Sequence, residues 1–142
     1  MKTGRDFLIV TNNPLVRDCL GGYYELDFDG SRTYRDVLIR VRDYVYAGHG
    51  LYTHPISGSV KPNETPYRSV VVSKATKPFD AYESELVSSS VQTYDKFTPR
   101  ERVLTEKMVE DFRLIDYTLL CGALDFDAVA GLSKFYQSKN NK

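Results

Sequence analysis

The chain has 142 residues, of which 42% are hydrophobic and 27% charged, as in an ordinary soluble globular domain. Nineteen basic residues balance nineteen acidic ones, so the chain lacks the positive field that attracts a phosphate backbone, and we expect no nucleic-acid partner. No segment resembles a signal peptide or reaches membrane-spanning length, which predicts a cytoplasmic protein without membrane association. We expect one α/β domain over residues 1–142, with a frayed polar tail at 137–142.

Two cysteines, Cys19 and Cys121, each lie within an apolar stretch with helical periodicity. Reduced cysteines often serve as small buried hydrophobic residues in cytosolic proteins. We expect that role here, and no disulfide.

The first third of the chain alternates between strand and helix patterns. Residues 7–10 are apolar on both faces, as in a central strand, and residues 24–28 alternate as in a strand at the edge of a sheet. Between them, an Asn cap followed by Pro14 predicts a short helix over 14–20. A capping box formed by Thr33 and Asp36 begins a second helix, which Gly48 ends.

The remaining pattern contains two strands and three helices. Strands are expected at 51–53 and at 69–73, the latter apolar on both faces. Helices are expected at 80–97, 98–120 and 125–136, the second beginning with the Thr-Pro-Arg-Glu sequence at 98–101. It can pack on its own sheet or on a second copy, which leaves a homodimer open. The residues expected to face the core from this second helix are Leu104, Met108, Phe112, Ile115 and Leu119.

This order predicts a three-layer α/β sandwich, with a four-stranded, mostly parallel sheet and helices on both faces. The direction of the fourth strand is open, because the preceding loop can form a parallel crossover or a wide hairpin. Its burial on both faces slightly favours the parallel arrangement.

The loop at residues 53–66 is the most informative segment. It is long, polar and without a helix pattern, and such connections are usually functional or disordered. Pro55, Pro62 and Pro66 restrict its backbone, which favours an ordered binding loop.

Ligands of open α/β sheets bind beyond the carboxyl ends of the strands. We therefore expect a small anion, such as phosphate, sulfate or a carboxylate, near the first and third strands, held by helix N–H groups, a backbone nest and Lys61. Ser73 and Lys74 would join this site if the fourth strand were parallel. The candidate ligand-binding residues are Asn12, Asn13, Ser31, Thr53, His54, Ser57, Gly58, Ser59, Lys61, Asn63 and Glu64.

His54 is the candidate catalytic residue, as a general base, a cation or a donor, alone or with Lys61 or Glu64. The alternative is a histidine that holds the loop through hydrogen bonds. A metal site is not expected, because the spacing of His49 and His54 across a strand tends to direct them to opposite sides. No cofactor is expected either, since dinucleotide and P-loop glycine motifs are missing, as is a nucleophile elbow.

Three segments together resemble the GrdX family, small proteins encoded beside the glycine reductase genes of amino-acid-fermenting anaerobic bacteria. They are Thr-Asn-Asn-Pro at 11–14, Asp-Val-Leu-Ile-Arg-Val-Arg-Asp at 36–43, and the segment 53–70. The resemblance covers residues 7–120, to which Asp111-Phe112 and Ile115-Asp116 also contribute.

The resemblance implies a cytoplasmic accessory role in the glycine, sarcosine or betaine reductase system, and it carries no catalytic residues. We therefore favour an accessory protein that binds a small anion or a reductase subunit through residues 53–66. The alternative is a small enzyme that uses His54 with Lys61 or Glu64 in acid–base chemistry on an anionic metabolite.

Overall fold

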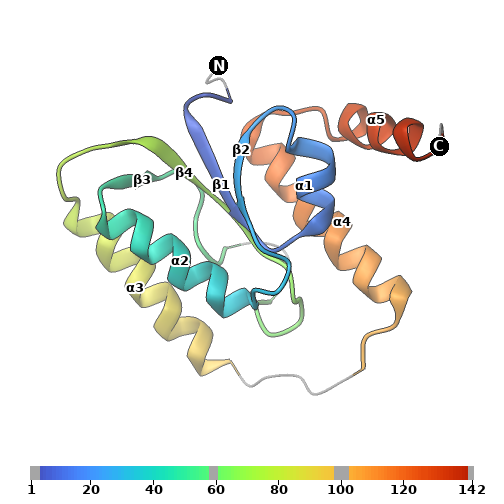
Figure 1. Ribbon diagram of the computed structural model, residues 1–142. Helices are drawn as coiled ribbons and strands as arrows, with labels where there is room; N and C mark the ends of the chain where they lie inside the picture. The colour runs from blue at the N-terminus through green and yellow to red at the C-terminus, as the bar shows by residue number, and fades with distance from the viewer. Residues whose placement is uncertain (1–3, 58–60, 98–102, 141–142) are drawn as a thin grey trace.

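A computed structural model describes residues 4–57, 61–97 and 103–140 of the chain. Its strands are β1 (Phe7–Thr11), β2 (Glu25–Phe28), β3 (His49–Leu51) and β4 (Ser69–Thr76). Its helices are α1 (Pro14–Leu20), α2 (Tyr34–Tyr46), α3 (Ala81–Lys96), α4 (Glu106–Leu124) and α5 (Ala128–Asn140). Figure 1 shows the sheet in the middle, with α2 and α3 on one side and α1, α4 and α5 on the other.

The four strands form a mixed sheet in the order β2-β1-β4-β3. β1 and β2 are parallel, whereas β4 is antiparallel to both of its neighbours, β1 and β3. The expected mostly parallel sheet is therefore wrong. The valines of β4 are buried on both faces because this strand lies between β1 and β3. A central strand is buried on both faces whether it is parallel or antiparallel to its neighbours. The burial of β4 therefore does not indicate its direction.

The antiparallel direction of β4 changes which residues meet at each edge. β3 leads into a wide hairpin that returns at the same edge, so the carboxyl ends of β1, β2 and β3 lie beside the start of β4. Ser73 and Lys74 lie towards the opposite edge, and Arg68 and Ser69 lie at this one instead.

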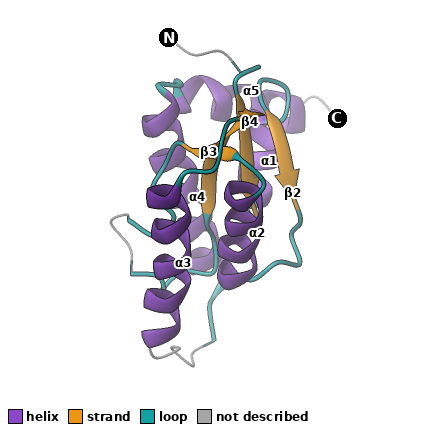
Figure 2. Cartoon of the chain, turned by 90° about the vertical axis from the view of Figure 1, so that its left-hand side faces the viewer, coloured by secondary structure: helices purple, strands orange, loops and turns teal. Residues whose placement is uncertain are grey.

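Alternating residues of the sheet contribute to two separate hydrophobic clusters. Ile9 and Val71 pack with residues of α1 and α4, including Leu20 and Leu120. On the other face, Val10, Val70 and Val72 pack with three valines of α2 and with Val87 of α3. Figure 2 looks onto this second face, where α2 and α3 run in front of the sheet. The two faces of the sheet are thus covered by different helices.

The cap residues fix the helix starts as the sequence predicted. Asn13 accepts a hydrogen bond from Leu15 N, which confirms a helix from Pro14 to Leu20. Thr33 and Asp36 form the expected capping box of α2, and Gly48 follows its end with a φ of 108°, a left-handed conformation that favours glycine. Cys19 and Cys121 are free and buried, as expected.

The start and the buried face of α4 differ from expectation. The predicted start at 98–101 lies outside the described residues, and within the described range 103–140 the helix begins at Glu106 after a Thr105 cap. Its buried residues are Asp116, Tyr117, Leu120, Cys121 and Leu124. Ile115 and Leu119 are instead 37% and 42% exposed. Asp116 can be buried because Asn13 and Ser69 donate hydrogen bonds to its carboxyl.

The bounds of further elements differ from those expected. The third strand occupies His49–Leu51, two residues earlier than expected, and β4 extends to Thr76. The segment expected to fray, 137–142, is helical as far as Asn140.

Candidate functional site

The carboxyl edge of β1 contains a buried polar cluster that links the sheet to α4. Thr11 Oγ1 lies 2.7 Å from Ser69 Oγ, across the β1–β4 pair. Ser69 Oγ donates to Asp116 Oδ2 at 2.7 Å, and Asn13 Nδ2 donates to the same oxygen at 3.0 Å. These four residues are all buried, so each polar atom depends on the others for its hydrogen bonds.

Asp116 is a buried carboxyl held by donors. Burial raises its pKa above the ordinary value, and the hydrogen bonds from Asn13 and Ser69, together with the nearby charge of Arg68, act in the opposite direction. The net direction is upward.

Asn13 has a structural role. Its Oδ1 caps α1, and its Nδ2 donates to Arg113 O at 2.9 Å as well as to Asp116. The cap uses the first-turn N–H group of Leu15, and α1 has seven residues. The start of α1 therefore gives less support to an anion site than the sequence indicated.

Asn12 joins three segments of backbone. Its Nδ2 donates to Arg32 O at 3.0 Å and to Pro66 O at 2.8 Å, and its Oδ1 accepts from Arg68 N at 2.9 Å. Both donor hydrogens of this amide are thus used by the protein. Asn12 fixes the return of the loop onto the sheet.

Arg68 holds the first part of the loop. Its Nε donates to Pro55 O at 2.6 Å, and its Nη2 donates to His54 O at 2.6 Å and to Ser57 O at 3.1 Å. Its Nη1 makes no hydrogen bond to a residue within the described part of the chain. One edge of the guanidinium thereby orders the loop.

His54 accepts hydrogen bonds through Nδ1 from the backbone N–H groups of Ile56, at 3.1 Å, and Ser57, at 3.0 Å. A nitrogen that accepts carries no proton, so the ring is neutral with its hydrogen on Nε2. Burial lowers the pKa of His54, and the charge of Arg68 lowers it further. His54 therefore presents a donor, Nε2–H, and holds the loop through its other nitrogen.

A cavity of about 150 Å³ lies between this loop and α4. His54, Arg68 and Asp116 contribute its charged and titratable groups. Its remaining lining residues are Thr53, Ser57, Ser69, Leu119, Leu120 and Ala123. The cavity thus combines donors, a carboxyl and an apolar wall, the usual composition of a small-molecule site.

The other candidate residues are divided among several places. Thr53 Oγ1 accepts from Val71 N at 2.9 Å beside the cavity. Ser31 lies in an exposed turn bonded to Asp29. Lys61 is exposed, and its carbonyl accepts from Glu64 N at 2.9 Å. Gly58 and Ser59 lie outside the described residues.

Asn63 and Glu64 line a different cavity, of about 440 Å³, with Arg35, Tyr94 and Asp95. Arg35 and Asp95 form a two-point ion pair there, at 2.9 and 3.2 Å. The residues expected to form one site therefore line two separate cavities, with His54 in one and Glu64 in the other.

Three residues of the site were missed by the sequence reasoning. Arg68 and Ser69 precede the valines of β4, and an antiparallel fourth strand would have located them at this edge. Asp116 stands alone in the stretch Leu-Ile-Asp-Tyr-Thr-Leu-Leu at 114–120. A single carboxyl in an apolar helix segment is a signal of a buried polar contact.

Comparison with known protein families matches residues 8–125 to the family described as GrdX-like protein. The chain belongs to the GrdX-like family. The resemblance over residues 7–120 predicted this membership, which supports the glycine reductase context that it implied. No curated protein and no solved structure matches the chain.

Two structural findings bear on other kinds of site. Among the residues described, no group of three or more His, Cys, Asp or Glu side chains is arranged to hold a metal ion. None of the helices in the described ranges combines the length and apolar character of a membrane span.

Proposed function

We propose that this protein is a cytoplasmic accessory protein of the glycine, sarcosine or betaine reductase system that binds a small carboxylate-bearing ligand. The ligand occupies the cavity that residues 53–57, Arg68 and Ser69 form with α4. Family membership supports the reductase context, and the cavity supports the ligand class.

The observation that carries this proposal is the pair of donors on the cavity wall. His54 Nδ1 is engaged with the loop backbone, which leaves Nε2–H as its remaining polar group. Arg68 keeps one edge of its guanidinium on the loop carbonyls, and its Nη1 is without a hydrogen bond to any described residue. Arginine and a neutral histidine together suit a carboxylate better than a phosphate dianion, which would favour more than one cation.

The geometry favours binding over catalysis. A general base needs a free acceptor, and the acceptor nitrogen of His54 is bonded to Ile56 N and Ser57 N. Glu64 lines the other cavity, and Lys61 lines neither. The acid–base enzyme based on His54 with Lys61 or Glu64 therefore has no support from these contacts.

Docking on a reductase subunit through residues 53–66 is the second candidate. It is favoured by the partly exposed Ile115 and Leu119, which lie on α4 beside the loop. Exposed apolar groups next to polar loop residues suit a protein contact.

The first test is titration of the protein with acetate, followed by calorimetry or by amide chemical shifts. Ala123→Leu should fill the cavity and weaken binding roughly tenfold or more, because the added side chain competes for the ligand volume. Lys61→Ala is the matched control and should bind as the wild type does. If Lys61→Ala abolishes acetate binding while Ala123→Leu does not, the cavity is not the site.

The second candidate has its own readout. Purified reductase components should be retained by the immobilised wild-type protein and lost when Ile115, which does not line this cavity, is changed to Ser. Loss of retention in this variant with unchanged acetate binding would support a docking site separate from the cavity, and retention by the variant would contradict it.

A further inference from the structure

A carboxyl on the cavity wall defines the ligand more narrowly. Asp116 lines the same cavity, and it is the only carboxyl among the cavity-lining residues of the described chain. We propose that the ligand is a small zwitterion, whose carboxylate faces His54 and Arg68 and whose ammonium group faces Asp116. This inference rests on the proposed function, because it concerns the same cavity.

The charges of the wall select against simpler ions. A plain carboxylate that reaches Arg68 also approaches Asp116, and a plain ammonium that reaches Asp116 also approaches Arg68. Within a partly enclosed cavity such like-charge approaches are screened less than in water. A molecule with both charges replaces each repulsion with an attraction.

The hydrogen bonds of Asp116 suit the role of an ammonium acceptor. Both Asn13 Nδ2 and Ser69 Oγ donate to Oδ2, and these donors counter the burial that raises the pKa of Asp116. They also fix its orientation, since Asn13 and Ser69 are themselves held by α1 and β4. The carboxyl is therefore pre-positioned on the cavity wall.

The volume of the cavity suits a small ligand. A cavity of about 150 Å³ in another protein holds benzene, a molecule of about six non-hydrogen atoms. The present cavity has a similar volume, about 150 Å³, and an apolar wall formed by Leu119, Leu120 and Ala123. An amino acid with no side chain or a very short one matches this volume.

Three probes of nearly equal size test the inference on the complete chain. Glycine carries both charges, acetate only the carboxylate, and methylammonium only the positive charge. Amide chemical shifts recorded at pH 7 and constant ionic strength should give glycine an affinity at least about tenfold above either single ion. The largest shifts should fall on residues 53–57 and 116–123.

Two variants locate the two charges. Asp116→Asn preserves shape and removes the negative charge, so glycine should lose its advantage over acetate while acetate binds at least as well as before. Ala123→Leu should weaken all three probes, and Thr118→Leu, exposed on the same helix and outside the cavity lining, should weaken none.

The outcomes separate the two proposals. Acetate and glycine binding with equal affinity, or an Asp116→Asn variant that keeps the glycine preference, overturns the zwitterion and leaves the carboxylate site in place. If Asp116→Asn does not fold, the comparison of glycine with acetate on the wild-type protein decides. Binding of none of the probes overturns both proposals.

Discussion

Ser69 donates a hydrogen bond of 2.7 Å to Asp116, and this contact joins the first residue of β4 to the middle of α4. Both residues line the cavity between the loop and the helix. Because β4 is antiparallel to β1, Ser69 also meets Thr11, so three elements share one buried polar cluster.

Asp116 gives the protein a pH dependence with a defined sign. Burial raises the folded-state pKa of this carboxyl above its ordinary 3.8, so the folded protein binds the proton more strongly than the unfolded chain does. This contribution to stability is complete below the ordinary value and is lost as pH rises through the folded pKa. Urea unfolding of Asp116→Asn should therefore lack a decline in unfolding free energy that the wild type shows above about pH 4. If the unfolding free energy of Asp116→Asn depends on pH as that of the wild type does, Asp116 is not the source of the decline.

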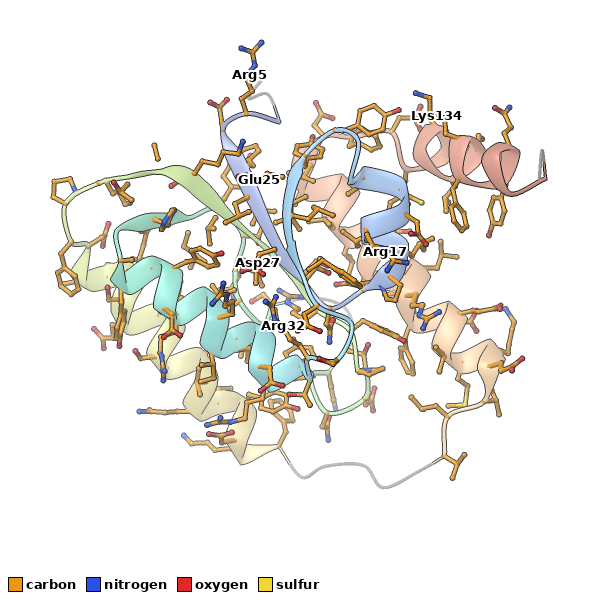
Figure 3. The ribbon with its side chains drawn as sticks, in the orientation of Figure 1. Arg5, Arg17, Glu25, Asp27, Arg32 and Lys134 are labelled. Atoms are coloured by element: carbon orange, nitrogen blue, oxygen red, sulfur yellow. The ribbon has the colours of Figure 1, made fainter. Side chains whose placement is uncertain are left out.

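The pKa of Asp27 is lowered, so its effect on the pH dependence of stability has the opposite sign to that of Asp116. Burial raises its pKa, but hydrogen bonds from Tyr44, Arg40 and Arg32 outweigh burial and lower the pKa to about 2. Arg32 Nη2 lies 2.6 Å from Asp27 Oδ1, and Figure 3 shows the two side chains together beside β2. The stabilisation is present above the unfolded pKa and lost as pH falls towards 2.

Asp27→Asn should accordingly lower the unfolding free energy at pH 7 by about 1–2 kcal/mol, a figure reduced for solvent screening of the exposed Arg40. The difference from the wild type should vanish near pH 2. Asp43→Asn is the matched control, since Asp43 is exposed and its contact to Arg42 is 3.5 Å. A loss for Asp43→Asn as large as that for Asp27→Asn would show that the Asp27 contacts are not specific.

His54 should be neutral in the folded protein, with its proton on Nε2. Nitrogen-detected NMR of the imidazole should show an unprotonated Nδ1 at pH 7, because two backbone N–H groups donate to it. The lowered pKa means that the corresponding stability is present above the unfolded pKa and is lost as pH falls through the folded one. A protonated Nδ1 would contradict the geometry of the loop.

Two neighbouring leucines test the orientation of α4. Leu120 is 4% exposed and belongs to the core, whereas Leu119 is 42% exposed. Leu120→Ala should lower the unfolding free energy by about 2–5 kcal/mol, and Leu119→Ala by less than about 1 kcal/mol. Equal losses of unfolding free energy, or a larger loss for Leu119→Ala, would contradict this orientation. Such a result would support the buried face that the sequence pattern predicted.

The sequence predicted the helices well where caps defined them. Asn13 and Thr33 each supply a side-chain oxygen to a local N–H group, a contact set by residues two or three positions away. The direction of β4 depends instead on which edge receives the 53–68 loop, and no local pattern encodes that choice. Asp116 was missed for a related reason: its partners, Asn13 and Ser69, are 103 and 47 residues away in the chain.

The candidate site stays a prediction, and the structure shows only which of its residues come together. Of the predicted residues, Thr53, His54 and Ser57 line one cavity. The predicted cation, Lys61, is exposed outside that cavity, and the one that lines it is Arg68. Loop residues close in sequence were expected to converge, but the turn at 61–64 directs Asn63 and Glu64 to the second cavity.

A crystal structure of the protein grown with glycine tests the account most directly. We predict an ordered glycine between the loop and α4, with its carboxylate about 3 Å from His54 Nε2 and Arg68 Nη1, and its ammonium group about 3 Å from the Asp116 carboxyl. A well-ordered cavity without glycine at a concentration that saturates its binding in solution, or glycine bound only elsewhere on the molecule, would contradict the account.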